Sequence, residues 1–414
     1  MSILINRGLE KIRRAFSEDR DFSFYILAGI FIGIATGIYS TIFNNFLNDV
    51  FHPTAEVRGA LEFPREMPGA SIMIVLGFLA FLGDIRVAIV SMVICICGML
   101  GIAFISNSYG TMVVWLVLYS LGQHLVMPVT PSIGMSLSKS TNYGSRLSTY
   151  SAFVLFATLF GYGIVWIGFK FLKMTYNSAF VICAVMYCCA ALIFGMMKKS
   201  KAKLKKPKFV FRKKYMLFYA LSAVNGGRKQ IFMTFAPWVL IQVYHLDAPV
   251  FAVFGLIISV LSIGSRKIVG WAIDHLGERF VLTVEAVILF VICFGYTFSG
   301  DFLSSGVAIV IMAACYIIDS SMSVVEMARS TYVKKIAVHP EDVTPTLSMG
   351  VSIDHIVAMT IPTLGGIVWA ATGEHGYRYI FLADAVFAAA NFFLSRRIRI
   401  DTEIPAGQGA PAQS

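Results

Sequence analysis

KKSKAKLKKPKFVFRKK, residues 198–214, places ten Lys and Arg in the middle of a chain that is otherwise mostly apolar. About six long apolar segments precede this tract and about six follow it. So many neighbouring cations cannot enter the hydrocarbon of a bilayer, and they strongly favour its cytoplasmic side. The tract therefore predicts a cytoplasmic connection between two membrane-embedded halves of similar size.

The composition is that of a membrane protein. Of the 414 residues, 57% are hydrophobic and 14% are charged, whereas soluble domains average about 25% charged residues. With about 20 residues per span plus loops, we expect an all-α membrane protein with about 12 transmembrane helices in two six-helix pseudo-repeat bundles. The predicted spans are 22–46, 58–82, 86–106, 111–135, 146–170 and 175–196 in the first half, and 215–244, 249–273, 279–299, 305–336, 346–371 and 376–395 in the second.

The net charge of +11 indicates membrane orientation rather than nucleic-acid binding. The surplus lies at the N-terminus, in the 198–214 tract and at Arg396, Arg397 and Arg399. Because Lys and Arg collect on the cytoplasmic side of membrane proteins, we expect both termini to be cytoplasmic and the number of spans to be even. The expected location is a plasma membrane, as in the bacterial inner membrane, and no nucleic-acid partner is expected.

The predicted domain organisation has five parts. Residues 22–196 form the first six-helix bundle and 215–395 the second, with 197–214 as the cytoplasmic basic linker. Apolar and basic residues are interleaved in 1–21, which is typical of a short amphipathic helix on the inner leaflet and equally of a frayed basic tail. Residues 396–414, rich in Pro, Gly and Gln at their end, are expected to be a cytoplasmic tail.

Sequence patterns for metal, cofactor and catalytic sites do not occur. All seven cysteines fall inside predicted spans and none lies in a polar loop with a CxxC spacing, so neither a zinc site nor a disulfide framework is indicated. No GxxxxGK[ST] stretch that would bind ATP phosphates occurs, nor does a nucleophile elbow or an HExxH pair. We therefore expect no metal, no cofactor and no enzymatic activity.

The two halves look like repeats. Gly163-Ile164-Val165-Trp166 recurs as Gly366-Ile367-Val368-Trp369, and both copies lie late in the fifth predicted span of their half. Parallel repeats related by an axis along the membrane normal are a known plan of transporters.

Between the eighth and ninth predicted spans the chain reads GWAIDHLGER, residues 270–279. Gly270, Asp274, Gly277 and Arg279 match a G-x-x-x-D-x-x-G-x-R signature, and on this motif the chain resembles the major facilitator superfamily. That family has the motif in the cytoplasmic loop after the second span of each half, which is its place here in the second half. The resemblance implies that these four residues act in gating, because glycines let the chain turn while Asp and Arg pair or cap helix ends.

The first half departs from that signature. Its equivalent stretch, residues 76–86, has Ala80 in the place of the aspartate, with Gly83, Asp84 and Arg86 nearby. The usual latch of the first half is therefore in question. The resemblance as a whole implies alternating access, in which the two bundles rock around a central binding site.

The strongest intramembrane charge cluster opens the second span. Arg58, Glu62, Arg65 and Glu66 are spaced i, i+4, i+7 and i+8, which places them on one helix face. Charged groups within a span are costly unless they face a cavity, so we assign these four to substrate binding. The alternative is an outer vestibule or loop with self-neutralising ion pairs.

The seventh span contributes Asn225, Arg228 and Lys229 beside the pair Gly226-Gly227. Two adjacent cations near the middle of the membrane need counter-charges or an anionic ligand, and the glycines would let the helix loosen and expose backbone groups. The alternative is a structural ion pair with a carboxylate on a neighbouring helix. His124 in the fourth span is a further substrate-binding candidate, although an intramembrane His is often a packing residue.

Three acids are candidates for proton coupling, because a buried carboxylate near cations can change its protonation when a cavity opens. Asp319 and Glu326 lie seven residues apart in the tenth span and are predicted to share a face. Arg329 can neutralise Glu326, so Arg228 or Lys229 is the expected partner of Asp319. Asp354 in the eleventh span is the third acid.

The expected function is secondary active transport of a small organic solute by alternating access, coupled to protons or to exchange. Arg228, with Lys229 and Arg58, favours an anionic solute; if the nearby acids already neutralise these cations, the cavity suits a neutral or zwitterionic one. The alternatives are a drug or lipid exporter of the same fold, a non-transporting membrane sensor and a membrane-embedded transferase. The expected partners are the small-molecule substrate and the lipid bilayer, with the monomer as the working unit.

Overall fold

The computed structural model describes residues 19–79, 81–137, 143–198, 211–339 and 342–399. Three predictions fall wholly or mostly outside these residues: the amphipathic helix in 1–21, the basic linker and the C-terminal tail. Ala80 also lies outside them.

The chain forms helices over almost all of its described length. The first half consists of α2 (Arg20–Phe46) with the π-helical turn η1 (Leu47–Phe51), α3 (Ala55–Ala60), α4 (Glu62–Leu79), α5 (Asp84–Phe104), α6 (Tyr109–Ser136), α7 (Tyr143–Phe171) and α8 (Tyr176–Gly195). The second half consists of η2 (Lys213–Tyr215), α9 (Met216–Gln242), α10 (Ala248–Phe302), α11 (Ser305–Ser321), η3 (Met322–Val325), α12 (Glu326–Ile336), α13 (Val343–Thr372) and α14 (Tyr377–Arg396).

These helices give the predicted twelve crossings in two bundles. In the described chain, nine helices are long and apolar enough to span a membrane, and α10 counts twice because Gly277, with φ 81°, bends it into two crossings. The remaining two crossings are α3–α4 and α9, which carry the polar residues of the second and seventh predicted spans. The two crossings that are least suited to lipid are therefore the ones with seven of the eight candidate substrate-binding residues.

Two predicted spans differ in detail. The second is interrupted at Leu61, because Pro64 has no N–H to donate to the preceding turn. The tenth contains the 3₁₀ turn Met322–Val325 between α11 and α12. A 3₁₀ turn has 3.0 residues per turn instead of 3.6, so Asp319 and Glu326 do not share a face as predicted: Asp319 is buried, whereas the Glu326 side chain is 61% exposed.

The repeat is visible at the junction of the second and third crossings of each half. Gly83 and Gly277 have nearly the same backbone angles, φ 78° and 81°, which glycine adopts without strain. Each is followed by a buried acid: Asp84 accepts a hydrogen bond from Ser132 Oγ on α6 at 2.5 Å, and Glu278 pairs with Lys335 on α12 at 2.7 Å. Because α6 and α12 belong to the fourth crossing of their halves, the same contact is built twice with different residues.

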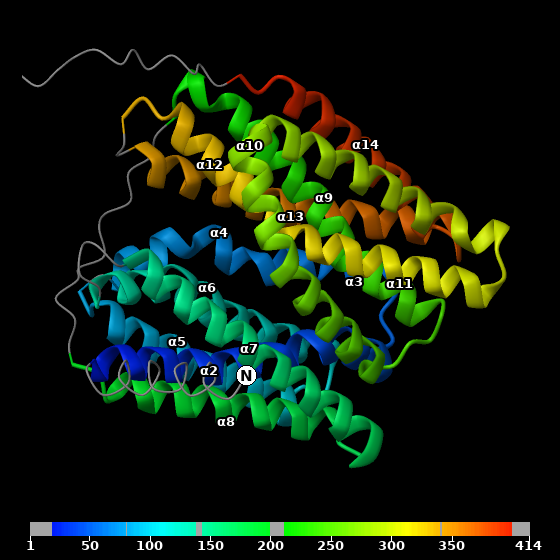
Figure 1. The fold of residues 1–414 in the computed structure, drawn as a ribbon. Helices are drawn as coiled ribbons and strands as arrows, with labels where there is room; N and C mark the ends of the chain where they lie inside the picture. Colours follow the sequence, from blue (N-terminus) through cyan, green and yellow to red (C-terminus); the bar gives the residue numbers. More distant parts are fainter. Residues whose placement is uncertain (1–18, 80, 138–142, 199–210, 340–341, 400–414) are drawn as a thin grey trace, which may run out of the picture.

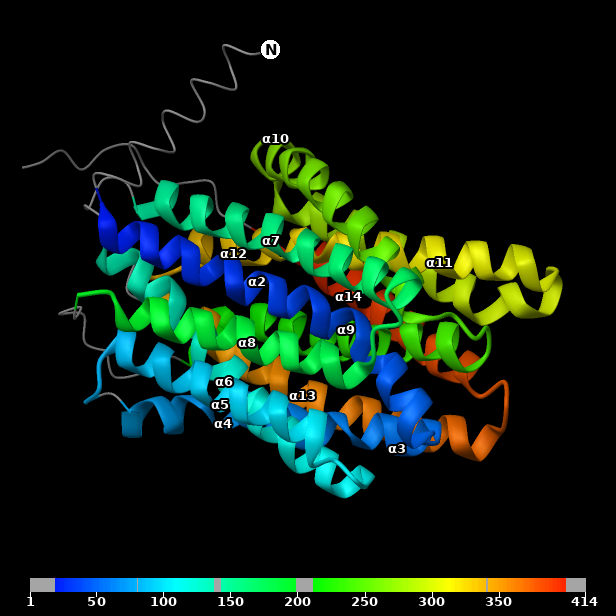
Figure 2. The same ribbon diagram turned by 90° about the horizontal axis from the view of Figure 1, so that it is seen from below.

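The two bundles lie side by side in Figure 1, with α3 and α4 of the first bundle facing the second, and Figure 2 shows α3 and α4 along one edge of the molecule. We call the end where α2 begins and α14 ends the linker end, at the left of Figure 1, and the end with the turns at His52 and His245 the far end. Helices α3 and α4 pack on α13 of the second half, and α10 packs on α7 and α2 of the first.

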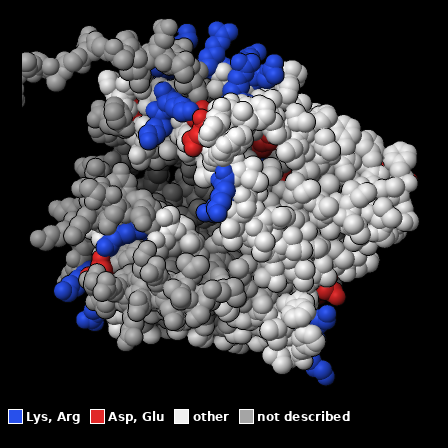
Figure 3. Space-filling model, viewed as in Figure 1, with Lys and Arg blue, Asp and Glu red and all other residues white. Residues whose placement is uncertain are grey.

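The far end is closed. Asn45 Nδ2 donates to the Leu246 carbonyl at 2.8 Å, and Gln242 Nε2 donates to Asn48 Oδ1 at 2.7 Å, each across the bundle interface. Two further hydrogen bonds between the bundles, from Gln230 to Glu62 and between His355 and Glu66, lie nearer to mid-membrane. Towards the linker end, a hollow separates the bundles (Figure 3).

Two glycines allow the closest approach of the bundles. A methyl group on Gly59 would lie 2.3 Å from the Pro362 carbonyl oxygen, and one on Gly366 would lie 2.6 Å from the Ala55 carbonyl oxygen. Backbone atoms of α3 and α13 therefore touch at the far end, and any side chain at either position would separate them. Gly163, the counterpart of Gly366 in the GIVW repeat, has open space around it.

We predict that Gly366→Ala shifts the protein towards a far-end-open form, because the added methyl overlaps with backbone at a cost of about 1–3 kcal/mol. Spin labels at Asp49 and Asp247, one on each bundle at the far end, would report a population at longer distance by double electron–electron resonance. Gly163→Ala is the matched control and should leave the distance distribution unchanged. Equal distributions for all three proteins would contradict the assigned role of this contact.

Candidate functional site

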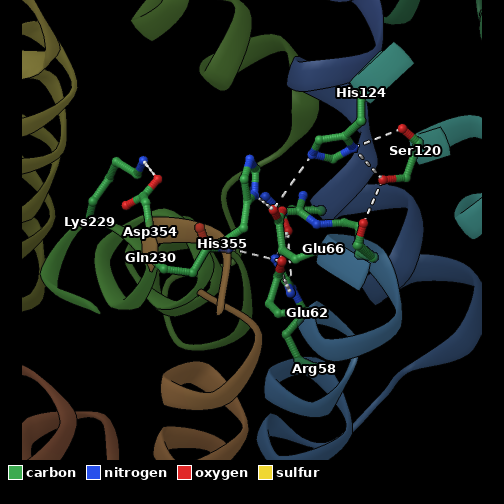
Figure 4. Close-up of polar contacts among 11 residues, drawn as sticks. Arg58, Glu62, Glu66, Ser120, His124, Lys229, Gln230, Asp354 and His355 are labelled. Atoms are coloured by element: carbon green, nitrogen blue, oxygen red, sulfur yellow. Dashed lines mark hydrogen bonds and ion pairs between the residues drawn. The ribbon is translucent and has the colours of Figure 1, made fainter. Parts of the chain in front are cut away.

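Glu62 is the centre of a buried ion-pair network at the second crossing. Its Oε1 accepts from Arg58 at 2.6 Å, and its Oε2 accepts from Arg65 at 2.6 Å. Gln230 Nε2 on α9 donates to the same Oε2 at 3.0 Å, which extends the network into the second bundle (Figure 4). The Glu62 side chain is completely buried, so this carboxylate depends entirely on these partners.

The predicted arrangement of this cluster on one face is confirmed. Arg58 is 1% exposed, donates to Asn44 Oδ1 at 3.0 Å and lies over the ring of Trp238 at 5.8 Å. The four residues therefore lie in helices rather than in a loop, and their charges neutralise one another, as the alternative supposed. Neither Arg58 nor Arg65 is left without an acid.

Glu66 continues the chain of contacts towards two histidines from different bundles. Arg65 donates to Glu66 Oε1 at 3.1 Å, while Glu66 Oε2 lies 3.0 Å from His355 Nδ1 on α13 and 3.8 Å from His124 Nε2 on α6. His124 Nδ1 lies 2.9 Å from the Ser120 carbonyl oxygen. One ligand atom from each of Glu66, His124 and His355 falls within 4.8 Å of the others, so the trio has the geometry to hold a metal ion.

The second half has its own ion pairs deep in the bundle. Arg228 pairs with Asp319 at 2.5 Å, which confirms the predicted partner. Arg329 pairs with Glu326 at 3.0 Å, as predicted, and with Glu285 at 2.6 Å. Asn225 accepts a hydrogen bond from Arg329 at 2.9 Å, so it is tied to this structural network rather than facing a free cavity.

Lys229 forms the more accessible ion pair of the seventh crossing. Its Nζ lies 2.6 Å from Asp354 Oδ2, and the two side chains are 40% and 21% exposed. The expected loosening at Gly226-Gly227 is wrong, because α9 runs unbroken from Met216 to Gln242. Gly226 serves packing instead: a methyl group there would lie 2.3 Å from Asp354 Oδ1, so an added side chain would displace this carboxylate.

Some residues of these networks were missed by the sequence reasoning. Glu285 and Asp384 are acids inside predicted spans, and the rule applied to Asp319 would have found both. Asp384 is fully buried and accepts from Cys293 Sγ at 3.5 Å. His355 also gives this signal as an ionisable residue of the eleventh predicted span, although it was not assigned to the site. Gln230 gives none, because it is uncharged and only its hydrogen bond to Glu62 marks it.

The candidate gating residues are only partly accounted for. Gly277 makes the predicted turn, but Asp274 and Arg279 are exposed and form no ion pair with any described residue. The charged contact at this place is made by Glu278 with Lys335. The gating role of Gly270, Asp274, Gly277 and Arg279 remains a prediction.

A two-bundle membrane protein with a polar seam between its halves belongs to the class of secondary transporters rather than of enzymes. The chain matches the Major Facilitator Superfamily over residues 26–346 and belongs to that family. A comparison with curated protein sequences gave no significant match.

Solved structures of similar fold are transporters. The nucleoside transporter NupG is 12% identical with a TM-score of 0.72, and the match covers 90% of this chain and 98% of that one. A bacterial homolog of the human lysosomal transporter Spinster is 16% identical with a TM-score of 0.68, covering 91% and 96%. The inward-open xylose transporter XylE from E. coli is 13% identical with a TM-score of 0.69, covering 90% and 94%. At these identities the likeness shows the fold alone.

Proposed function

We propose that this transporter moves a small polar organic solute by alternating access, driven by a proton gradient or by exchange. The observation that carries the proposal is the seam of polar groups where the two bundles meet. It runs from Glu62 and Gln230 to Glu66 and His355, near the middle of the membrane. His124 lies 15 residues from the start of α6 and 12 from its end, or about 22 and 18 Å along the helix.

The charges of the site favour a neutral or zwitterionic solute over an anionic one. Arg58, Arg65 and Arg228 are each engaged by a buried acid, and an anion would have to displace that acid. The accessible groups are the Lys229–Asp354 pair and the Glu66–His355 contact. An ion pair of this exposure can bind the ammonium and the carboxylate of a zwitterion, or the hydroxyl groups of a neutral solute.

Coupling is assigned to Asp319 rather than to Glu326. Asp319 is buried against Arg228 from a different helix, so movement between α9 and α11 would change its charge balance. Glu326 is largely exposed and is held by Arg329 of its own helix. A group that binds a proton in one state only must have an environment that differs between the states.

The charge distribution supports a cytoplasmic linker end. In the described chain, basic residues gather at that end (Figure 3), including Arg20, Lys198, Arg212, Lys213, Lys214, Arg266, Lys267, Arg279, Lys334, Lys335, Arg396 and Arg397. The far end carries the acids Asp49, Glu56, Asp247, Asp301 and Glu374 against three basic residues, Lys170, Lys173 and Arg378. This is the positive-inside pattern. If the linker end is cytoplasmic, the hollow of Figure 3 opens to the cytoplasmic side of a plasma membrane. Because one chain contains both bundles, the monomer is the expected transporting unit.

A ligand screen by thermal stabilisation tests the substrate class, since a solute that binds the folded protein raises its apparent Tm by mass action. We predict that amino acids, nucleosides or sugars stabilise the wild type, that Lys229→Gln abolishes the shift, and that organic acids and sugar phosphates have no effect. Glu326→Gln is the matched control and should keep the shift. Stabilisation by anions that is lost in Arg228→Ala would instead establish an anionic substrate.

The coupling group is tested by Asp319→Asn against Glu326→Gln in proteoliposomes, with the solute identified by that screen. Asp319→Asn should reduce the solute accumulation driven by a pH gradient more than 10-fold, while counterflow exchange persists. Glu326→Gln should transport like the wild type. Gradient-driven accumulation by Asp319→Asn at the wild-type level would remove Asp319 from the coupling mechanism.

A further inference from the structure

In the trio of Glu66, His124 and His355, the Glu66 and His124 side chains turn acceptor atoms towards each other, while His355 Nδ1 lies within hydrogen-bond distance of Glu66 Oε2. Ser120 has one hydroxyl proton, which it donates to the Arg65 carbonyl oxygen at 2.5 Å. Ser120 Oγ and the Ser120 carbonyl are therefore both acceptors towards His124 Nδ1, at 3.1 and 2.9 Å. His124 must carry its proton on Nδ1, and its Nε2 lone pair then faces Glu66 Oε2 at 3.8 Å.

This arrangement matches the outer shell of a transition-metal site. A histidine that binds a metal usually donates its other ring N–H to a backbone carbonyl or carboxylate, which fixes the tautomer and the ring orientation. Glu66 is oriented similarly, because Arg65 holds Oε1 at 3.1 Å and leaves Oε2 to the imidazoles. At Zn–N and Zn–O distances of about 2.0–2.1 Å, two ligands of a tetrahedral Zn²⁺ lie roughly 3.4 Å apart. The 3.0 and 3.8 Å separations from Glu66 Oε2 bracket that value.

The space around the trio is shaped by a glycine. A methyl group on Gly69, one turn after Glu66, would lie 2.7 Å from His124 Nε2 and 2.9 Å from His355 Cε1. Both imidazoles therefore occupy the volume that any other residue at position 69 would fill. The three side chains are 12–15% exposed, which leaves room for water or a solute at a fourth coordination position.

We propose that Glu66, His124 and His355 bind a divalent transition-metal ion of the Zn²⁺ class, with Glu66 Oε2, His124 Nε2 and one ring nitrogen of His355 as ligands. Two imidazoles and one carboxylate with an open fourth position are a ligand set that Zn²⁺ accepts. Because His355 is on α13 while Glu66 and His124 are on α4 and α6, the bound ion connects the two bundles and stabilises the far-end-closed form. This goes beyond the transport proposal, which needs no metal.

The test is a Co²⁺ titration of the purified full chain without a histidine tag, because tetrahedral Co²⁺ gives intense visible d–d absorption. We expect one equivalent to bind with these bands and to be displaced by Zn²⁺. His124→Gln and His355→Gln should each weaken binding by more than 10-fold. His275→Gln, at an exposed histidine of α10 beside the bend at Gly277, is the matched control and should bind like the wild type.

Two further readouts keep the proposal falsifiable. Gly69→Ala keeps all three ligand residues in the chain and should still lose the Co²⁺ bands, since its methyl displaces both imidazoles. Adding Zn²⁺ should shorten the distance between the far-end spin labels in the wild type and leave this distance unchanged in His355→Gln. If the wild type binds no Co²⁺, the metal site is overturned, and a proton is the cation shared by Glu66 and His124. If both histidine variants bind Co²⁺ with the affinity of the wild type, the ligand assignment is overturned. Neither result would affect the transport proposal, which the solute screen tests separately.

Discussion

The central constraint on this structure is a completely buried carboxylate, Glu62, that accepts from Arg58, Arg65 and Gln230. An ionised group in such a place is tolerated only when all its partners are present, and removing one partner of a buried pair typically costs about 3–5 kcal/mol. Two of the three donors belong to the same helical segment, but Gln230 belongs to the other bundle. The polar interior of the first half is thus completed only when the second half lies against it at the far end.

Other contacts along the seam also depend on how closely the two bundles approach. Backbone contact at Gly59 and Gly366 sets how closely α3 and α13 approach, and this approach places His355 beside Glu66. The polar contacts of the seam are hydrogen bonds and ion pairs, which water in an open cavity can replace. A seam of this kind suits a protein that must alternate between two arrangements of its halves.

The two halves have the same local backbone geometry at some equivalent positions and different packing at others. Gly83 and Gly277 repeat the same turn, followed by Asp84 and Glu278 in equivalent contacts. Gly366 is essential for packing at the far end, while its counterpart Gly163 is not confined. The halves therefore share a scaffold and differ in their chemistry, so a role found for one residue does not transfer to its counterpart.

Much of the fold was predictable from the sequence, because hydrophobic length and the basic tract at 198–214 are direct consequences of the bilayer. The ion pair of Arg228 with Asp319 was also predictable, since a mid-membrane cation needs an acid. What failed depends on tertiary detail. The shared face of Asp319 and Glu326 was lost to a 3₁₀ turn, and Gly226 proved to serve packing. Gln230 could not be assigned, and the partner of the intramembrane His355 could not be named, because nothing local shows which residues of α4 they meet.

The most direct measurement is of spin-label distances at both ends of the protein in a bilayer, comparing wild type with Glu62→Gln. Labels at Asp49 and Asp247 report the far end, and labels at Met135 and Lys334 report the linker end. In the wild type we expect a short distance between the labels at the far end and a long one at the linker end. Glu62→Gln should lengthen the far-end distance and shorten the linker-end distance. Unchanged distances at both ends, with Glu326→Gln as the control, would contradict the claim that Glu62 holds the bundles closed.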